Sequence, residues 1–579
     1  MHVIATAGHV DHGKSALVRA LTGMEPDRWA EERRRGMTID LGYAWTELPS
    51  GAQLAFVDVP GHERFIGNML AGVGPATAVL FVVAADERWR AQSAEHLAAA
   101  DALRLRHGLL AITRTDLGDP AAASDEARRR IAETSLGEVD TIPVSAVTGA
   151  GVAELSAALD RLLARLPPPD TVVPLRLWID RAFAMRGSGT VVTGTLGAGT
   201  VTVGDRLEIS GRPARVRALQ CLGQPRERVT AVARVALNLR GVAATEVSRG
   251  DVLVEPGAWH WTSTVDVRID TPSGHLANPL MHVGTAALPV RVRRFDAGHA
   301  RVTLPRPLPL RAGDRAILRD PGQPNMFGML VLDADPPPLT RRGAAAARAT
   351  ELATAMGRPD ARAEVARRGA VRRQHLEALG MAIGELGDAR DVAGWLVAAH
   401  AWQGWLAALP AAVDEWHARS PLDAGVPLEA LRRRVGIPDR DLLKPLIAEA
   451  GLSVRDGRVV PPGQDVSLAP GIDTVCSRLA AAPFAAPERY ELDALGLGRR
   501  ELAAAERAGR LLRLNDGVVL LPSAPDDAVR MLRALPQPFT TSQARQALGT
   551  TRRVAIPLLE FLDAHGLTDR IDQLTRRVI

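Results

Sequence analysis

The sequence predicts a multidomain chain with an α/β domain, two β-barrels and a helical C-terminal segment made of repeated units. Three observations predict this order. Short apolar runs alternate with helical periodicity from Val3 to Leu166, β-branched residues with glycine turns fill residues 173–332, and the rest is helical and rich in Ala, Leu and Arg. Three consecutive prolines separate each pattern from the next, at 167–169 and at 336–338.

Length and charge set the first limits. A chain of 579 residues has room for about four domains. Its 71 basic and 66 acidic side chains give a net charge of +5, which does not by itself indicate a nucleic-acid partner. Nearly all the basic residues are Arg, because Lys occurs only at Lys14 and Lys444. The aromatic content of 4% argues against binding single strands mainly by base stacking.

The sequence lacks the features of secreted and membrane proteins. Cys221 and Cys476 cannot form a disulfide framework or a four-ligand metal site. The longest apolar run, Ala78–Ala85, is too short to cross a bilayer, and the first residues lack the pattern of a signal peptide. We therefore expect a cytoplasmic protein that has no membrane partner.

Residues 1–168 form the predicted α/β domain. Their apolar runs are short and separated by stretches of helical periodicity, such as residues 91–105, which is the pattern of βαβ units. We therefore expect a parallel sheet covered by helices on both faces. Its predicted strands are Val3–Ala7, Leu54–Val59, Val79–Ala84, Leu109–Thr113 and Ile142–Val144.

Two β-barrels are expected next, at residues 169–256 and 257–338. Gly-Asp pairs at 204–205, 250–251 and 313–314 lie beside alternating apolar residues, as turns between antiparallel strands do. The two predicted barrels meet near Pro256, and each has the size of a small all-β domain.

Residues 339–579 contain a repeat. Helical stretches end at Gly451, Gly509 and Gly566, and these glycines lie 58 and 57 residues apart. Asp456-Gly457 and Asp516-Gly517 provide hairpin turns at matching places. Helices followed by a two-stranded hairpin describe a winged helix-turn-helix domain. Three copies are visible, the last at about 531–579, and a degenerate fourth would fill Arg341 to about His400.

A phosphate-binding loop follows the first predicted strand and opens a helix. Its glycines allow backbone N–H groups to converge on phosphate oxygens at the helix N-terminus. A lysine in this loop offers a positive charge to the β and γ phosphates, and a serine hydroxyl can bind Mg²⁺. The candidate nucleotide-binding residues here are Gly8, Asp11, His12, Gly13, Lys14 and Ser15.

The second predicted strand is followed by further candidate residues for the nucleotide and Mg²⁺ site. Asp58 can hold Mg²⁺, and the N–H of Gly61 can contact the γ-phosphate. His62 comes next, where an imidazole can orient the attacking water, although a loop histidine can also serve another purpose. Thr38 is a candidate second hydroxyl ligand for Mg²⁺, in a segment that closes when the γ-phosphate is present.

Later loops are expected to select the base, because a doubly wound sheet binds ligands at its carboxyl edge. Asp116 can accept hydrogen bonds from the two adjacent N–H donors of guanine, while Thr113 and Arg114 precede it in the same loop. Ser145-Ala146 can present a backbone N–H to guanine O6. Alone, this motif is weak, since Asp116 can also be an ordinary helix N-cap.

The order of these loops resembles that of the translational GTPases, and residues 187–195, GSGTVVTGT, resemble the second domain of that family. The family's guanine loop usually reads Asn-Lys-x-Asp, where this chain has Thr113 and Arg114. The long extension after the second predicted barrel resembles the selenocysteine-specific elongation factors of bacteria. Residues 281–286, 539–545 and 557–562 also look like that family.

The resemblance implies a function and a set of partners. A member of this family is a GTP-hydrolysing factor that uses Mg²⁺ and delivers selenocysteyl-tRNA to the ribosome, at UGA codons marked by an mRNA hairpin. It is expected to act as a monomer. Two alternatives stay open: a general aminoacyl-tRNA-carrying translational GTPase with an RNA-binding tail, or a GTP-switched RNA-binding regulator.

The resemblance also assigns a pocket for selenocysteine. The selenol of selenocysteine is ionised at neutral pH, whereas the hydroxyl of its serine precursor is not. Cationic side chains therefore favour selenocysteine over serine. Arg181 and Arg234 are assigned to the selenolate, and Asp180 to the α-amino group or to orienting Arg181. The alternative is a surface ion pair between Asp180 and an Arg.

The last predicted domain is expected to bind the mRNA hairpin. Thr541-Ser542 can cap a helix that runs through Leu548, and a second helix starts near Arg552. An excess of arginine here can contact phosphates while RNA shape and a few bases give specificity. The candidate RNA-binding residues are Arg545, Arg552 and Arg553, and the alternative for each is a solvated surface side chain.

Overall fold

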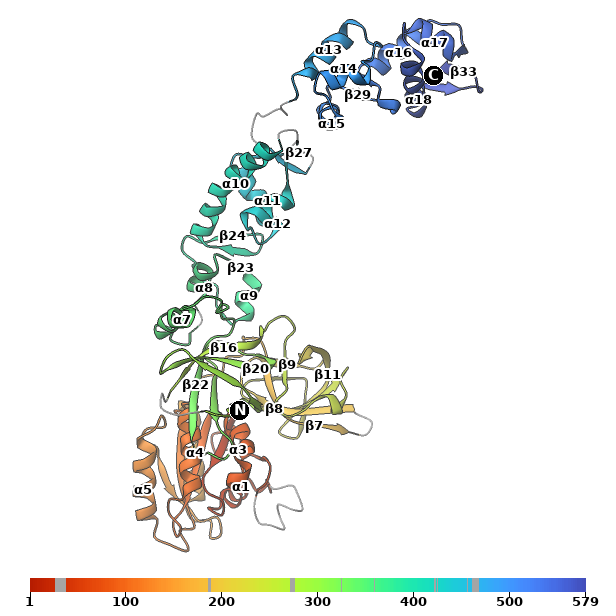
Figure 1. Ribbon diagram of the computed structural model, residues 1–579. Coiled ribbons are helices and arrows are strands. Elements are labelled where there is room, and N and C mark those ends of the chain that lie inside the picture. Colours follow the sequence, from red (N-terminus) through yellow and green to blue (C-terminus); the bar gives the residue numbers. More distant parts are fainter. Residues whose placement is uncertain are drawn as a thin grey trace. The chain divides into compact units, whose positions relative to one another are not determined.

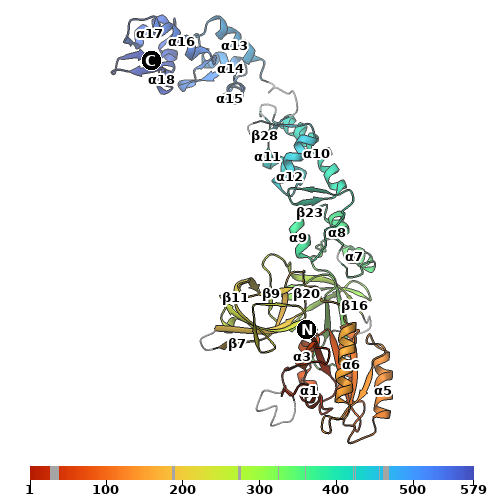
Figure 2. The same ribbon diagram turned by 180° about the vertical axis from the view of Figure 1, so that it is seen from behind.

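The computed structural model describes the chain apart from a few short segments (Figures 1 and 2). It divides into two compact units, Met1–Glu364 with Arg372–Leu386, and Val365–Val371 with Gly387–Ile579. None of the described helices is long and apolar enough to cross a membrane. The described residues are 1–26, 38–185, 189–270, 276–323, 325–358, 360–420, 423, 425–455, 457–460 and 468–579.

The first unit begins with a six-stranded sheet of order β2-β3-β1-β4-β5-β6. Its strands are β1 (His2–Ala7), β2 (Gly42–Glu47), β3 (Gln53–Asp58), β4 (Ala78–Ala84), β5 (Gly108–Thr113) and β6 (Thr141–Pro143). Five of these were predicted to within two residues, and they are parallel as expected. The exception is β2, an edge strand antiparallel to β3, which the apolar pattern did not reveal.

Helices cover both faces of this sheet, as predicted. They are α1 (Lys14–Thr22), α3 (Ile66–Val73), α4 (Ala91–Ala102), α5 (Pro120–Ala132) and α6 (Val152–Arg165), with a short 3₁₀ helix η1 (Glu63–Phe65) before α3. Apolar residues of α1 and α6 pack on one face of the sheet, while those of α3, α4 and α5 pack on the other. The carboxyl ends of the parallel strands therefore meet at one edge, between two helical layers.

The first β unit is a closed barrel. Its strands have the order β10-β15-β7-β8-β14-β11-β12, and an additional pairing of β10 with β11 closes the ring. The elements are β7 (Arg176–Met185), β8 (Gly189–Leu196), β9 (Thr200–Thr202), β10 (Arg206–Ile209), β11 (Arg212–Cys221), β12 (Gln224–Arg226), β13 (Arg228–Thr230), β14 (Ala233–Arg240), η2 (Ala244–Glu246) and β15 (Val252–Val254). Gly204 and Gly250 lie in turns, as expected.

The second β unit forms a half-barrel where the sequence predicts the second β-barrel. It is one seven-stranded antiparallel sheet of order β18-β17-β21-β22-β16-β20-β19. The strands are β16 (Trp261–Ile269), β17 (Leu280–Val283), β18 (Ala286–Pro289), β19 (Arg291–Arg294), β20 (His299–Pro309), β21 (Arg315–Arg319) and β22 (Met326–Asp333). Helix α7 (Ala344–Ala353) packs on this sheet through Leu352.

The remaining elements form four groups, each of which begins with helices and ends in a two-stranded hairpin. A short strand follows the first helix in every group except the third, whose residues 471–520 are all described. They are α8 (Ala361–Arg368), β23 (Ala370–Arg372), α9 (Arg373–Ala378), β24 (Arg390–Val392) and β25 (Trp395–Val397); α10 (Ala399–Arg419), β26 (Val426–Pro427), α11 (Leu428–Val435), α12 (Arg440–Glu449), β27 (Ser453–Arg455) and β28 (Arg458–Val460); α13 (Gly471–Ala481), α14 (Arg489–Ala494), α15 (Arg499–Arg507), β29 (Leu512–Arg513), η3 (Asn515–Gly517) and β30 (Val519–Leu520); α16 (Ala524–Arg533), β31 (Phe539–Thr540), α17 (Thr541–Ala547), α18 (Arg552–Ala564), β32 (Thr568–Arg570) and β33 (Thr575–Val578).

The helix ends in these repeats follow the sequence. Gly451, Gly509 and Gly566 have φ near +70°, the left-handed conformation that ends a helix and that glycine adopts without strain. Each is followed by a hairpin, and Asp516-Gly517 forms the expected turn between β29 and β30. Asp456 of the other predicted turn lies outside the described residues. The first copy is degenerate, since no helix forms between α9 and β24, where every residue is described.

Candidate functional site

A tight loop joins β1 to α1 at the carboxyl edge of the sheet. Gly8, Asp11 and Gly13 have positive φ, and Gly13 directly precedes the helix. A Cβ on Gly8 would lie 2.2 Å from the carbonyl oxygen of Val82, so only glycine fits there. A loop with left-handed residues directly before a helix N-terminus is the kind of backbone that binds phosphate.

Hard oxygen ligands gather beside the loop. The Ser15 hydroxyl donates to Asp58 Oδ2 at 2.6 Å and lies 3.0 Å from Thr38 Oγ1. Thr6 donates to the other carboxylate oxygen of Asp58 at 2.7 Å. Burial raises the pKa of Asp58, whereas the bond from Ser15 opposes this shift. Two hydroxyls and a carboxylate at one point are a donor set that suits Mg²⁺. The residues just before Thr38, Arg35-Gly36-Met37, lie outside the described residues.

Lys14 is buried beneath the loop and donates to the carbonyl oxygens of His9 at 2.7 Å and Gly8 at 3.1 Å. A Cβ on Gly61 would lie 2.5 Å from Lys14 Nζ, so the segment after Asp58 reaches this ammonium. The loop, the lysine and the second predicted motif therefore meet, as expected.

Two buried histidines support the loop from below. His12 turns its side chain toward β4, with Nδ1 3.4 Å from the Val82 carbonyl, so it can offer a nucleotide only its backbone. His96 on α4 accepts a hydrogen bond from the Gly8 N–H at 3.1 Å. Burial lowers the pKa of His12 to about 3 and that of His96 well below its usual value, so both are neutral. His96 was not predicted, because nothing in its helix marks it.

His62 begins the 3₁₀ helix that follows Gly61. Its Nδ1 accepts a hydrogen bond from the N–H of Arg64 at 3.2 Å, and the side chain is half-buried. Within the described part of the chain nothing bonds to Nε2. The ring is thus oriented through one nitrogen while the other is available to a water molecule.

The predicted base-recognition loops also meet the phosphate loop. Thr113 Oγ1 donates to the carbonyl oxygen of His12 at 2.7 Å. Arg114, in the left-handed conformation, donates to the Asp11 carbonyl and to Glu87 at 2.8 Å. These contacts tie the end of β5 to the loop although the Asn-Lys pair of the family is absent.

Asp116 and Ser145 lie together at the edge of the same site. Ser145 donates to Asp116 Oδ1 at 2.5 Å, so the carboxylate is oriented, and Ala146 follows Ser145 directly. The two loops that were expected to recognise the base are therefore in contact.

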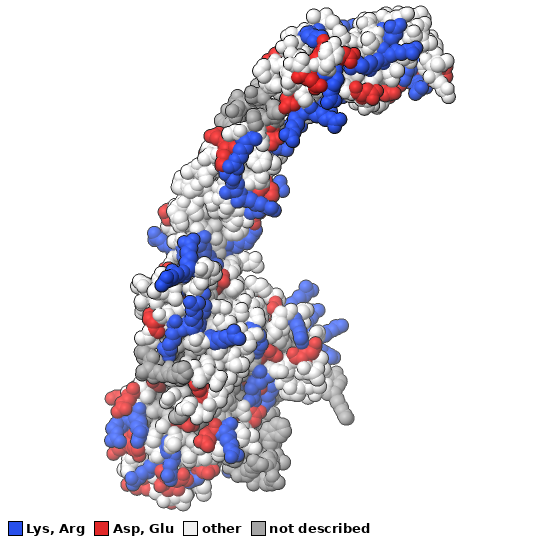
Figure 3. All heavy atoms as spheres, in the orientation of Figure 1, with Lys and Arg blue, Asp and Glu red and all other residues white. Residues whose placement is uncertain are grey.

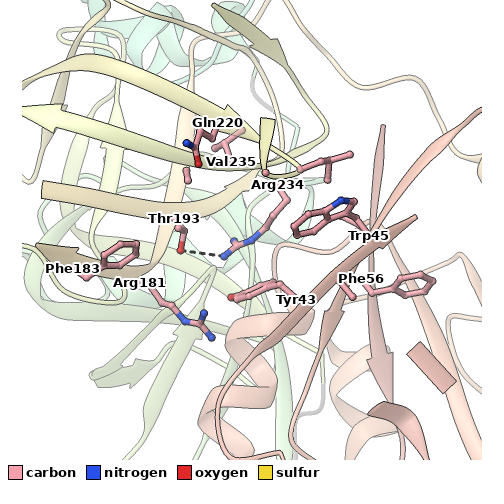
Figure 4. Close-up of a pocket in the computed structure, with 14 residues that line it drawn as sticks. Tyr43, Trp45, Phe56, Arg181, Phe183, Thr193, Gln220, Arg234 and Val235 are labelled. Atoms are coloured by element: carbon pink, nitrogen blue, oxygen red, sulfur yellow. Dashed lines mark hydrogen bonds between the residues drawn. The ribbon is translucent and has the colours of Figure 1, made fainter. Parts of the chain in front are cut away.

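A second pocket lies between β2 of the α/β domain and the closed barrel (Figure 4). Its volume is about 170 Å³, and Arg181 and Arg234 both line it. Asp180 and Arg181 come from β7, and Arg234 comes from β14. The sequence therefore identified two arginines that meet in one cavity.

The ion pairing in this pocket differs from the expectation. Arg234 binds both carboxylate oxygens of Asp180, with 2.7 Å between Nη2 and Oδ1, and this pairing raises the pKa of Arg234. Asp180 therefore orients Arg234, and the prediction that it orients Arg181 is wrong. Arg181 instead donates to the Leu41 carbonyl and lies 3.7 Å from Asp40.

Tyr43 and Arg249 are two residues of this region that sequence reasoning missed. The ring of Tyr43 lies 3.8 Å from the Arg234 guanidinium carbon and 4.8 Å from that of Arg181. Arg249 donates to the backbone oxygen of Asp180 at 3.0 Å and to Asp40 at 2.5 Å. The only available signal was that Tyr43 is one of two tyrosines in the chain.

The predicted RNA-binding arginines of the last repeat fall into two groups. Arg552 is exposed and Arg545 is half-buried, and neither side chain makes a hydrogen bond or ion pair within the described residues. Arg553 instead donates to the Ala486 carbonyl at 2.8 Å and lies 3.0 Å from Glu488, so it joins α18 to the preceding repeat. Arg and Lys side chains also gather in patches on the other helical repeats (Figure 3).

The start of α17 differs slightly from the prediction. Thr540 caps the helix, one residue before the expected Thr541-Ser542, because its hydroxyl and the side chain of Gln543 form a capping box. Helix α18 begins at Arg552 as predicted.

Comparisons with known proteins agree with this architecture. The family model "Elongation factor Tu GTP binding domain" matches residues 1–165, and the model "Elongation factor SelB, winged helix" matches residues 530–577. The selenocysteine-specific elongation factor of Desulfomicrobium baculatum is 31% identical, with 98% of both chains covered. That of Escherichia coli (strain K12) is 40% identical over 59% of this chain and 56% of the relative.

A solved structure agrees over the whole chain. The crystal structure of a bacterial selenocysteine-specific elongation factor EF-Sec has a TM-score of 0.78 and 26% identity, covering 100% of this chain and 99% of that one. With a full-length relative, a matching GTP-binding domain and a matching winged helix, this chain belongs to the selenocysteine-specific elongation factors, a family of translational GTPases.

Proposed function

We propose that this factor binds GTP and Mg²⁺, carries selenocysteyl-tRNA, and delivers it to ribosomes at UGA codons marked by a downstream mRNA hairpin. The observation that carries this proposal is the pocket in which Arg181 and Arg234 meet, next to a phosphate-binding domain. A factor with this task works on cytoplasmic ribosomes, and we take it to act as a monomer with no membrane partner.

Residues of the first domain hold the nucleotide in this proposal. The N–H groups of Asp11, His12 and Gly13 and the Lys14 ammonium bind the phosphates, Gly8 allows the tight turn of the loop, and Gly61 contacts the γ-phosphate. Asp116, Ser145 and Ala146 bind guanine, while Thr113 and Arg114 hold their loop against the phosphate loop. Ser15, Thr38 and Asp58 would hold Mg²⁺, which neutralises phosphate charge when it is bound.

His62 is the proposed catalytic residue for GTP hydrolysis. Its Nδ1 is fixed by the Arg64 N–H, so Nε2 can orient a water molecule for attack on the γ-phosphate. The segment that contains Thr38 then loses its contacts to the γ-phosphate, and the tRNA is released.

The cargo pocket selects by charge. The selenolate of selenocysteine is an anion, whereas the side chain of the serine precursor is a neutral hydroxyl of similar length. Hydrogen bonds to an ionised acceptor are roughly twice as strong as neutral ones. Arg181 and Arg234 favour the selenolate, and Asp180 holds Arg234 in place.

Separate parts of the chain serve these tasks in our proposal. Residues 1–168 bind GTP, residues 169–256 and 257–338 hold the tRNA, and the winged helices of 339–579 reach the message. Arg545 and Arg552 in the last of them, at about 531–579, are free to contact RNA phosphates.

Binding of two forms of the same tRNA tests the proposal. Full-length protein with a non-hydrolysable GTP analogue is titrated with selenocysteyl-tRNA and with its serine-charged precursor. We expect at least about tenfold tighter binding of the selenocysteine form, because a difference of about 1.4 kcal/mol suffices for that ratio. Equal affinities would leave only a general tRNA-carrying GTPase.

A further inference from the structure

Helix α4 is bonded to the phosphate loop near its N-terminal end. The side chain of Gln92 accepts a hydrogen bond from the Val10 N–H at 3.2 Å, and His96 accepts one from the Gly8 N–H at 3.1 Å. Both N–H groups are therefore held by α4, and neither can bind a phosphate. These distances lie at the long end of the usual range for hydrogen bonds, so a helix shift of about 0.5 Å would break them.

The other end of α4 touches the half-barrel. The carbonyl of Ala102, the last residue of the helix, accepts a long hydrogen bond of 3.4 Å from Arg315 Nη1 on β21. A Cβ on Gly328 of β22 would lie 2.7 Å from the same carbonyl oxygen, so only glycine lets this strand approach the helix end so closely. Figure 1 shows α4 next to β22. The helix therefore connects the phosphate loop to the half-barrel.

A single carboxylate holds this contact together. Asp270 follows β16, and its Oδ2 accepts hydrogen bonds from Arg315 at 3.0 Å and from Arg104, just beyond α4, at 3.4 Å. Arg268 lies 3.6 Å from the other carboxylate oxygen. The Asp270 side chain is only 11% exposed, so salt and water screen these charges weakly. Asp270 is thus the common partner of three arginines, one of which is attached to the end of α4.

Loss of that carboxylate would act directly on the helix end. Arg104 and Arg315 share Asp270, so without its charge two guanidinium groups face each other uncompensated, and their repulsion moves the end of α4 away from β21. The helix extends for about 15 Å from Gln92 to its last residue and moves as one body. Packed helices shift by about 1–2 Å in such rearrangements, which is more than the bonds to the phosphate loop tolerate.

We propose that Asp270 is a positioning residue for the nucleotide. By holding the end of α4 on the half-barrel, it keeps Gln92 and His96 bonded to the phosphate loop and so slows the release of GTP and GDP. The inference rests on the nucleotide site of the proposed function. It adds a residue of the half-barrel to those that control how long the nucleotide stays bound.

Dissociation of a fluorescent GDP analogue from the full-length protein tests this. Asp270→Asn keeps the shape of the side chain and removes its charge. We expect about tenfold faster dissociation, within the range of about 5–150-fold that is typical of coupling between separate sites. Asp314→Asn is the matched control, because Asp314 binds Arg176 at 2.6 and 2.7 Å and so joins the half-barrel to the closed barrel instead of to α4. Its dissociation rate should equal that of the wild type.

A double variant separates positioning through α4 from a general loss of stability. Gln92→Ala removes the acceptor of the Val10 N–H and should itself speed GDP release. Because Asp270 acts through the same helix, adding Asp270→Asn to Gln92→Ala should speed release by less than about threefold, whereas independent sites give effects that multiply in full. Asp270→Glu keeps the carboxylate and should restore most of the slow release.

The outcomes separate this inference from the proposed function. A wild-type rate of GDP release in Asp270→Asn overturns the inference and leaves the nucleotide site intact. Full multiplication of the Asp270→Asn and Gln92→Ala effects overturns it too, because Asp270 would then act independently of the helix. Equally fast release from Asp314→Asn would show a general loosening of the domains, with the same consequence. If the wild type binds no GDP, the proposed function and the inference fail together.

Discussion

The guanidinium of Arg249 in the closed barrel donates a 2.7 Å hydrogen bond to the side-chain oxygen of Asn68 on α3. Asn68 in turn donates to the backbone oxygen of Ile39 at 2.9 Å, and Arg249 also binds Asp40. Its Nε donates to the backbone of Asp180. One side chain thus joins the segment after Thr38, the helix after His62 and the strand that lines the pocket of Arg181 and Arg234.

Arg249→Ala should therefore weaken the dependence of tRNA affinity on the nucleotide. The wild type is expected to bind its tRNA more tightly with GTP than with GDP, and couplings of this kind are about 5–150-fold. We expect the ratio of tRNA affinities with GTP and with GDP to be about tenfold smaller in the variant. Measuring tRNA dissociation constants with a GTP analogue and with GDP checks this.

Arg240→Ala is the control, because Arg240 is exposed on the same barrel. If Arg249 served only as a phosphate contact of the tRNA, both affinities would fall equally and the ratio would stay at the wild-type value.

Lys14→Ala should abolish GTP binding. Lys14 is buried, its ammonium lies against the loop carbonyls of Gly8 and His9, and in the proposed function it binds the phosphates. Calorimetric titration with GTP should detect no binding in the micromolar range. Lys444→Ala removes the only other lysine, which is exposed on α12, and should bind GTP like the wild type. Micromolar affinity in Lys14→Ala would refute the phosphate site.

Features made by residues close together in the sequence were predicted better than features made by distant segments. The phosphate loop was found because its residue types and spacing impose one backbone conformation. The pairing of Asp180 was missed because β7 has an irregularity between Ile179 and Arg181, opposite Gly194 and Thr193. Such a bulge re-aims side chains in a way that an alternating pattern does not reveal.

Features made by distant segments were also missed. Tyr43 meets Arg181 and Arg234 only because β2 lies against the closed barrel, and no periodicity in a short edge strand records that contact. His96 supports Gly8 across 88 positions of sequence, and its helix pattern marks it only as a buried position. Arg553 was predicted to bind RNA, yet its partners lie in the preceding repeat.

His62→Ala should slow GTP hydrolysis without weakening nucleotide binding. The ring is oriented through Nδ1, and removal of a group that positions a nucleophile typically costs about 10²–10⁴-fold in rate. Ribosome-stimulated phosphate release measures the rate, and GTP affinity is measured on the same samples. His107→Ala, in the same domain, serves as the control. A wild-type rate of GTP hydrolysis in His62→Ala would show that His62 takes no part in the reaction.

His282 should make the protein less stable in acid. It lies on β17, 7% exposed, with Cε1 3.9 Å from where a Cβ on Gly67 of α3 would lie. Burial, and then the nearby Arg319, lower the pKa of His282 to about 4 from 6.5. The folded state thus binds this proton less readily than the unfolded state. Its stabilisation is complete above about pH 6.5 and falls by up to about 3 kcal/mol as the pH drops toward 4.

Melting temperatures between pH 7 and pH 4.5 test this assignment. His282→Gln should lose less stability over that range than the wild type, because it has no group to protonate at the contact with α3. His400→Gln changes an exposed histidine and should follow the wild-type curve. If the melting temperatures of His282→Gln and the wild type fall equally between pH 7 and pH 4.5, protonation of His282 does not destabilise the fold.

Substitutions of the arginines in the last repeat should affect either RNA binding or the stability of the fold, depending on the residue. Arg545→Ala and Arg552→Ala should each weaken binding of the mRNA hairpin and reduce its salt slope by about one, as loss of one phosphate contact does. Arg553→Ala should leave that slope unchanged and lower the free energy of unfolding by about 1–2 kcal/mol, because it loses its bonds to Ala486 and Glu488.

Hairpin affinity measured at several salt concentrations, with melting temperatures of the same full-length samples, distinguishes the two groups. Arg489→Ala, an exposed change on α14, is the control for both measurements. A reduced salt slope in Arg553→Ala would show that this side chain leaves Glu488 to bind RNA. An unchanged salt slope in Arg545→Ala and Arg552→Ala would show that the RNA binds to another face of the repeat.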